Sequence, residues 1–148
     1  MDNQSEMPMH SLIQRFSEFN HHFSKLEKQI LAKYGITKSG FSIMSFINDK
    51  KITLNELANE SDLDKSTLSR QVKQLEKKGF LTKEPGTDKR YMYLSLTPES
   101  RQLILAFSFE FEKSYSLIFK SWPADEKQLL LVLMGRVNRS IQSFQLVK

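Results

Sequence analysis

The sequence predicts a mainly helical protein with a small β-hairpin, an α+β fold class. Apolar residues recur at helical spacing over long stretches near both ends of the 148-residue chain. The middle of the chain holds two shorter helix patterns, each behind a capping residue. Two apolar, aromatic runs follow, separated by the turn sequence 85–88 (Pro-Gly-Thr-Asp). We therefore expect an N-terminal helix in residues 1–36, a central domain in 37–97 and C-terminal helices in 98–148.

The first helix is indicated by a single apolar stripe with alternating spacings of four and three residues. Its members are Leu12, Phe16, Phe19, Phe23, Leu26 and Ile30. Such a stripe resembles a coiled-coil seam, so a partner helix is expected. The helix should end near Tyr34, because Gly35 suits the position that follows a helix C-terminus. A second helix, from about Lys38 to Asn48, would bury residues such as Phe41, Met44 and Ile47.

Two capped helices are predicted next, after a short extended link at residues 51–53. Thr53 and Glu56 have the spacing of a capping box, and the helix that they open should stop near Ser61. Asp64 can cap the following helix, Lys65 to Lys78, which Gly79 would end.

The two apolar runs, Phe80–Glu84 and Tyr91–Leu96, should pair as a two-stranded hairpin. Thr97 and Pro98 then fit the cap and the first position of a new helix. The apolar stripe of that helix is Ile104, Phe107, Phe111, Tyr115, Ile118 and Trp122. Pro123 opens a last helix with apolar positions at Leu130, Leu133, Val137, Ile141 and Phe144.

Composition narrows the class of function. The net charge of +5 and the pI near 9.4 favour an acidic partner such as nucleic acid. Without cysteine, disulfides and thiolate metal sites are excluded, and a cytoplasmic location is expected. The longest apolar run, 129–134, is too short to span a membrane, and the polar N-terminus shows no secretory signal.

The helix predicted at residues 65–78 has two chemically distinct faces. Leu68, Val72 and Leu75 form the stripe to be buried. The opposite face carries Ser66, Ser69, Arg70, Lys73 and Lys77, with Thr67 at its edge. Hydroxyl side chains and arginine can contact base edges, whereas lysines more often hold phosphates. For an isolated helix of this composition a solvated surface is the better explanation, but the capped helix before it and the basic hairpin after it favour DNA binding.

The hairpin tip, Asp88-Lys89-Arg90, offers a second contact. An arginine at such a tip can enter a narrow minor groove, and an aspartate two residues earlier can hold that arginine in place. A solvated turn with an incidental ion pair is the alternative reading.

Together, these residues resemble the multiple-antibiotic-resistance-regulator (MarR) family of winged helix-turn-helix transcription factors. The resemblance lies in the segment LNELANESDLDKSTLSRQVKQLEKKGFL, in Asp88-x-Arg90 and in Leu96-Thr97, and with the flanking helices it covers nearly the whole chain. One departure is Ser100, where many family members have glycine.

The resemblance implies a homodimer held by interlocking N- and C-terminal dimerisation helices. It also implies sequence-specific binding of double-stranded DNA, as a repressor on a roughly palindromic operator. Arg90 would contact the minor groove with Asp88 as its support. The remaining DNA-binding residues would be Lys65, Ser66, Thr67, Ser69, Arg70, Lys73 and Lys89.

Family members often release DNA when a small aromatic compound binds between the dimer helices and the winged domain. The corresponding residues here are Phe16, Phe19, His22, Phe23, Phe41 and Met44, although such a stripe also fits a hydrophobic core. We expect no cofactor and no metal, because the histidines are poorly spaced as ligands.

An enzyme is not expected, because the chain has no phosphate-binding loop and no nucleophile motif. The alternative function is a winged-helix module that binds a protein instead of DNA, for which a neutral or acidic recognition face with exposed apolar residues would be typical.

Overall fold

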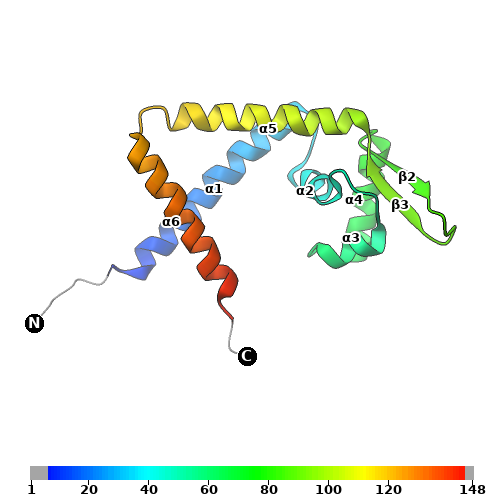
Figure 1. Cartoon of the computed structure of the whole chain (residues 1–148), viewed down its shortest axis with the longest axis horizontal. Coiled ribbons are helices and arrows are strands. Elements are labelled where there is room, and N and C mark those ends of the chain that lie inside the picture. The colour runs from blue at the N-terminus through cyan, green and yellow to red at the C-terminus, as the bar shows by residue number, and fades with distance from the viewer. Residues whose placement is uncertain (1–6, 146–148) are drawn as a thin grey trace, which may run out of the picture. The chain divides into compact units, whose positions relative to one another are not determined.

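The computed structural model describes residues 7–145 and confirms the mainly helical fold with a small antiparallel sheet (Figure 1). Two compact units make up the chain, Met1–Phe111 and Glu112–Lys148. Residues 1–6 and 146–148 of the predicted terminal segments lie outside the described residues. The elements are α1 (Met9–Lys33), α2 (Lys38–Ile47), β1 (Ile52–Thr53), α3 (Leu54–Glu60), α4 (Lys65–Lys77), β2 (Leu81–Pro85), β3 (Met92–Leu96), α5 (Pro98–Ile118) and α6 (Ala124–Ser143).

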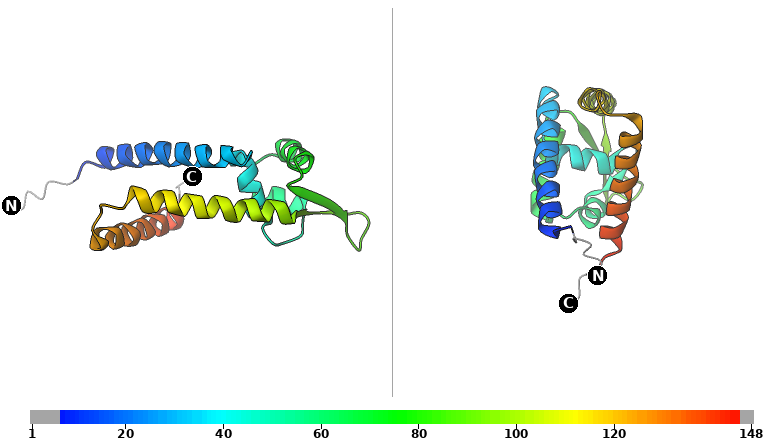
Figure 2. Two further views of the ribbon diagram at one scale, coloured as in Figure 1. Left: turned by 90° about the horizontal axis from the view of Figure 1, so that it is seen from above. Right: turned by 90° about the vertical axis from the view of Figure 1, so that its left-hand side faces the viewer.

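The sheet has three strands, so the prediction of a two-stranded hairpin was incomplete. The strand order is β1-β3-β2, and both pairings are antiparallel. Ile52 of β1 pairs with Leu94 of β3, and both side chains are buried. Burial of this apolar pair favours pairing of the segment before α3 with the edge of β3 that β2 does not occupy. Figure 2 shows the turn between β2 and β3 extending beyond the helices of the first unit.

The helix ends follow the signals in the sequence. Thr53 Oγ1 accepts a hydrogen bond from the Glu56 backbone N–H (3.2 Å), and the Glu56 carboxylate accepts one from the Thr53 N–H (3.1 Å). This reciprocal pair is the predicted capping box. Gly35 and Gly79 follow α1 and α4 with φ of 68° and 78°, a region that glycine occupies without steric cost.

A single hydrophobic core joins the helices of the first unit to its sheet. Its most buried members are Leu31 of α1, Ile43, Met44 and Ile47 of α2, Leu57 of α3, Leu68 and Val72 of α4, and Leu81 and Leu94 of the sheet. Because α4 contributes to this core along one face only, its other face remains at the surface.

Thr97, the residue before α5, hydrogen-bonds to the backbone that follows α4. Thr97 Oγ1 donates to the Gly79 carbonyl (2.9 Å), and the Thr97 backbone N–H donates to the Phe80 carbonyl (3.1 Å). Ser100 is fully buried here, and its hydroxyl donates to the Thr97 carbonyl (2.9 Å). The serine therefore satisfies its own polar group at the position where many relatives have glycine.

The predicted stripes of the second unit run past the ends of the helices, and Phe144 lies beyond α6. Trp122 lies beyond the end of α5 and is substantially exposed. Among the described residues of α6 none is buried, and several of its apolar side chains are largely exposed. Over residues 7–145, no helix combines the length and apolarity required to cross a membrane.

Asn48, which ends α2, is a point of backbone strain. Its φ of 48° and ψ of −118° lie where a side chain is disfavoured. We expect Asn48→Gly to raise the free energy of unfolding by about 1 kcal/mol, because glycine adopts this conformation without the strain. Urea unfolding at pH 7 measures the change. Asn48→Ala, which keeps a Cβ, serves as the control, and a glycine variant no more stable than the alanine variant would contradict the assignment.

Candidate nucleic-acid interface

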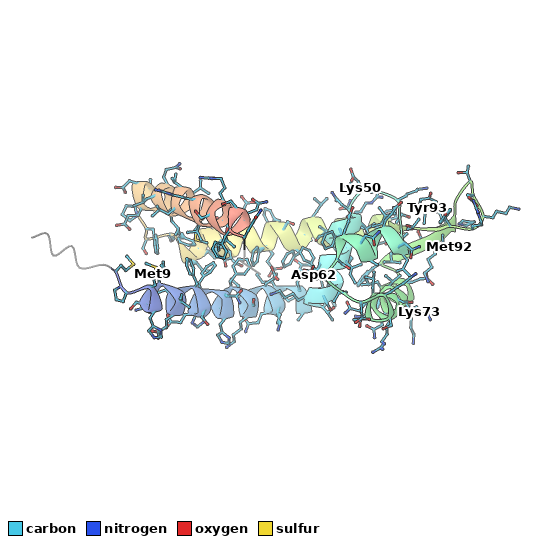
Figure 3. All side chains as sticks on the ribbon, turned by 90° about the horizontal axis from the view of Figure 1, so that it is seen from below. Met9, Lys50, Asp62, Lys73, Met92 and Tyr93 are labelled. Carbon is cyan, nitrogen blue, oxygen red and sulfur yellow. The ribbon has the colours of Figure 1, made fainter. Side chains whose placement is uncertain are left out.

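The α4 helix presents a basic, polar face to the surface because its other face is fixed in the core. Leu68, Val72 and Leu75 are at most 5% exposed. Arg70 and Lys73 lie on the opposite face and are exposed. Lys73 is labelled in Figure 3 on the outer side of the helix. The buried stripe therefore determines which side chains of α4 a partner can reach.

Asp64 organises the beginning of α4. Its Oδ1 accepts hydrogen bonds from the Thr67 backbone N–H (2.8 Å) and from the Ser66 hydroxyl (2.6 Å). Its Oδ2 accepts one from the Thr67 hydroxyl (2.7 Å). The Ser66 hydroxyl, and after it the bonds from Thr67, hold the pKa of Asp64 far below its ordinary value. The carboxylate is therefore ionised at neutral pH and caps the helix.

The predicted contact residues of α4 and of the hairpin tip are all at the surface of the first unit. Thr67 and Ser69 are half-buried against neighbouring side chains. The others are exposed, namely Lys65, Ser66, Arg70, Lys73, Lys89 and Arg90.

The hairpin tip contains a preformed arginine–aspartate pair. Arg90 Nε and Nη2 donate to the Asp88 carboxylate at 3.0 and 2.7 Å, and the Arg90 backbone N–H donates to Oδ1 (3.1 Å). These bonds, the side-chain ones first, lower the pKa of Asp88 and raise that of Arg90. The guanidinium also lies 5.9 Å from the centre of the Tyr91 ring. The geometry fixes the direction of Arg90 while its side chain remains 81% exposed.

Gly86 packs against the ring of Tyr93 next to the turn of the hairpin, a contact that sequence reasoning missed. A Cβ added to Gly86 would come within 2.2 Å of the Tyr93 ring, so a side chain at this position cannot be accommodated without moving the ring. Tyr93 and Met92 are labelled on the hairpin in Figure 3. Turn composition pointed to Gly86 as a turn residue but gave no sign of the aromatic ring packed against it.

A salt bridge between the two outer strands of the sheet also escaped prediction. Lys51 Nζ lies 3.2 Å from Glu84 Oε2, and it joins the residue before β1 to β2. Neither residue belongs to a recognisable pattern in the sequence. Such an exposed pair contributes little to stability, but it adds to the contacts that hold the outer strands of the sheet beside β3.

The residues predicted to line an effector site pack mainly against other rings of the first unit. Phe23 meets Phe111 edge-on at 5.6 Å, and Phe41 lies 4.7 Å from Phe107. Phe19 packs 5.6 Å from Phe23. Among the rest of the set, Met44 is fully buried in the core, Phe16 is half-buried and His22 is exposed.

A cavity of about 360 Å³ lies beside one of these rings. Its lining includes Phe41 together with Glu27, Ser42, Ser45 and Phe46. The other five predicted residues are not part of this lining. For a metal, the part of the chain described here has no group of three or more histidine, aspartate or glutamate side chains placed as ligands.

Comparison with known proteins finds a family match in the central part of the chain. Residues 36–91, which contain α2, α3, α4 and the hairpin up to Tyr91, match the family model described as "MarR family". Two curated relatives come from Bacillus subtilis (strain 168), and both are named uncharacterised HTH-type transcriptional regulators. YwaE is 29% identical over 115 residues, which is 76% of this chain and 67% of the relative. YxaD is 32% identical over 88 residues, which is 59% of this chain and 62% of the relative.

Solved structures of MarR proteins share the fold over most of this chain. A MarR family protein from Bacillus stearothermophilus superposes with a TM-score of 0.81 at 16% identity, covering 97% of this chain and 99% of that one. Wild-type MarR of E. coli in its apo form gives 0.73 at 24% identity, covering 90% and 98%. MepR, a transcription regulator of the Staphylococcus aureus multidrug efflux pump MepA, gives 0.74 at 18% identity, covering 85% and 95%. Residues 36–91 therefore match the MarR family, and most of the chain has the fold of solved MarR proteins.

Proposed function

We propose that this chain is a MarR-family regulator, a homodimeric repressor that binds a roughly palindromic operator in double-stranded DNA. Residues 37–97 bind the DNA, and the helices within 1–36 and 98–148 hold the two copies together. The observation that carries the proposal is the exposed basic face of α4, which lies opposite a buried apolar stripe and follows the capped helix α3. A second helix set in this way is the element that enters the major groove in helix-turn-helix proteins.

The residues of α4 are suited to two kinds of contact with DNA. Ser66, Thr67, Ser69 and Arg70 are suited to base edges, because hydroxyls and a guanidinium offer directional hydrogen bonds. Lys65 and Lys73 are suited to phosphates, which set affinity and orientation without reading sequence.

The hairpin adds a second reading element. Arg90, oriented by Asp88, is suited to a narrow minor groove, where the negative potential is greatest. Lys89 would neutralise a neighbouring phosphate. The alternative of a protein-binding module has less support, because the apolar side chains Leu68, Val72 and Leu75 of α4 are buried rather than offered to a partner.

Dimerisation is supported by apolar side chains that this chain leaves uncovered. Leu129, Leu131 and Leu133 of α6 are 57%, 67% and 47% exposed, and Ile13 of α1 is 64% exposed. Exposed leucines repeated along one helix indicate an interface. A second copy of the chain would cover them and place two α4 helices in successive major grooves, about one turn of DNA apart.

Release by a small aromatic compound is the regulatory part of the proposal. Phe16, Phe19, His22, Phe23, Phe41 and Met44 remain the candidate binding residues. The cavity beside Phe41 offers room for an aromatic ring, and the ring contacts between Phe41 and Phe107 connect it to α5. A compound that separates these rings would change the packing between α2 and α5.

The role of Arg90 is tested by fluorescence anisotropy on labelled fragments of the gene's own upstream DNA, with unlabelled competitor present. We expect Arg90→Ala to weaken operator binding strongly and to leave the melting temperature nearly unchanged, because the guanidinium is exposed. Arg15→Ala, which removes the same charge from an exposed side chain of α1, is the matched control. Equal losses in the two variants, or unfolding of Arg90→Ala, would contradict a reading role for the hairpin.

The role of Lys73 is tested through the salt dependence of binding. We expect Lys73→Ala to weaken binding to every sequence and to flatten the plot of log K against log salt by roughly one unit, because one phosphate contact is lost. Titrations at four salt concentrations measure the slope. Lys25→Ala, an exposed lysine of α1, should leave it unchanged. A slope unaffected by Lys73→Ala would remove Lys73 from the interface.

Dimerisation is tested by sedimentation. The wild-type protein should sediment at twice the 17.3 kDa mass of the chain. Combining Leu129→Asp with Leu133→Asp, one turn apart on α6, should shift it towards the monomer, because two carboxylates would enter an apolar interface. Gln128→Asp, on the same helix, is the polar control. A dimer that tolerates the double substitution would exclude this part of α6 from the interface.

A further inference from the structure

The side chains of Asp64, Ser66 and Thr67, at the beginning of α4, together offer hydrogen-bond acceptors only. Each hydroxyl has a single proton, and Ser66 and Thr67 both donate theirs to Asp64 at 2.6 and 2.7 Å. The carboxylate is ionised, since its pKa lies far below the ordinary value, and it has no proton to give in return. The lone pairs of Ser66 Oγ and Thr67 Oγ1 are what remain for a partner.

The donors of the α4 face are its cationic side chains, Lys65 at the first position and Arg70 and Lys73 about one turn later. Arg70 and Lys73 are exposed and carry only N–H groups on their side chains. Apart from Lys65, which the proposed function assigns to a phosphate, the surface is thus divided along the helix, with the acceptors of Asp64, Ser66 and Thr67 first and the donors Arg70 and Lys73 after them. This order is a property of the folded chain, because it depends on the proton positions that Asp64 imposes.

The acceptors and the donors of α4 suit different base edges in the major groove. Cytosine offers its N4 amino group and adenine its N6 amino group as donors, whereas guanine O6 and N7 and thymine O4 are acceptors. A surface that offers only acceptors can accept hydrogen bonds from the amino group of cytosine or adenine. Against guanine or thymine, an acceptor of the protein would face an acceptor of the base, and no hydrogen bond would form. Rejection of the wrong base is as important to specificity as attraction to the correct one.

We propose that Asp64 is a specificity-determining residue, which fixes the hydroxyls of Ser66 and Thr67 as acceptors so that the first turn of α4 selects cytosine or adenine and rejects guanine and thymine. The inference rests on the proposed function, because it requires α4 to lie in the major groove. Asp64 acts as a positioning residue for the two hydroxyls.

The charge of Asp64 has a second effect. A carboxylate at the surface that faces DNA repels phosphates, so it weakens binding to every sequence while it sharpens the choice of base. If Asp64 only capped the helix, Asp64→Asn would leave the base preference unchanged, because asparagine is an equally good N-cap.

The test compares Asp64→Asn with wild type. Asparagine is as good an N-cap as aspartate, but it is neutral, and its amide can itself donate to the hydroxyls. The half-site is first selected from a randomised DNA library with wild-type protein. The selection is repeated with Ser66→Ala. The position at which this variant loses the base preference of wild type is the base pair that the first turn of α4 contacts. Anisotropy with all four bases at that position gives the discrimination of each variant.

We expect wild type to favour cytosine or adenine there by about tenfold over guanine and thymine, the size of a typical mismatch. Asp64→Asn should bind random DNA more tightly and discriminate less than about threefold, with an unchanged melting temperature. Asp62→Asn removes the same charge from an exposed residue two positions earlier, labelled in Figure 3. This control should keep the base preference.

Three results would overturn the inference: a guanine or thymine preference at that position, no position that depends on Ser66, or equal effects of Asp64→Asn and Asp62→Asn on discrimination. Wild-type protein that binds all sequences alike would instead overturn the proposed function, and the inference with it.

Discussion

The burial of one apolar stripe on α4 is the constraint on which the rest of the structure depends. Leu68, Val72 and Leu75 occupy the core beside residues of α2, α3 and the sheet. Burying three such side chains contributes several kcal/mol, roughly 1.5 to 3 for each, and rotating the helix would forfeit most of it. The stripe therefore fixes α4 about its own axis, and with it the direction of every polar side chain on the opposite face.

Much of the fold could be predicted because its signals are local. The capping box at Thr53 and Glu56, the cap at Asp64 and the glycines after α1 and α4 each act within a few residues. The spacing of Leu68, Val72 and Leu75 likewise identified the buried face of α4. The same local order gave the exposed candidate residues of α4 and the Asp88–Arg90 pair at the hairpin tip.

The features that could not be predicted depend on distant parts of the chain. The pairing of β1 with β3 joins residues about forty positions apart, and two residues of β1 have no pattern of their own. The contact of Tyr93 with Gly86 arises from hairpin register. The apolar stripe of α6 is real in the sequence but remains exposed here, because a stripe states only that a helix has an apolar face and not which surface covers it.

The hydroxyl of Thr97 links elements that would otherwise move separately. It donates a hydrogen bond to the carbonyl of Gly79, just after α4. Thr97 itself stands between the last residue of β3 and the first residue of α5. The segment after α4, the inner strand of the hairpin and the first turn of α5 thus meet at one residue. A shift of that turn would therefore disturb the hydrogen bonds from Thr97 to Gly79 and to Phe80 together.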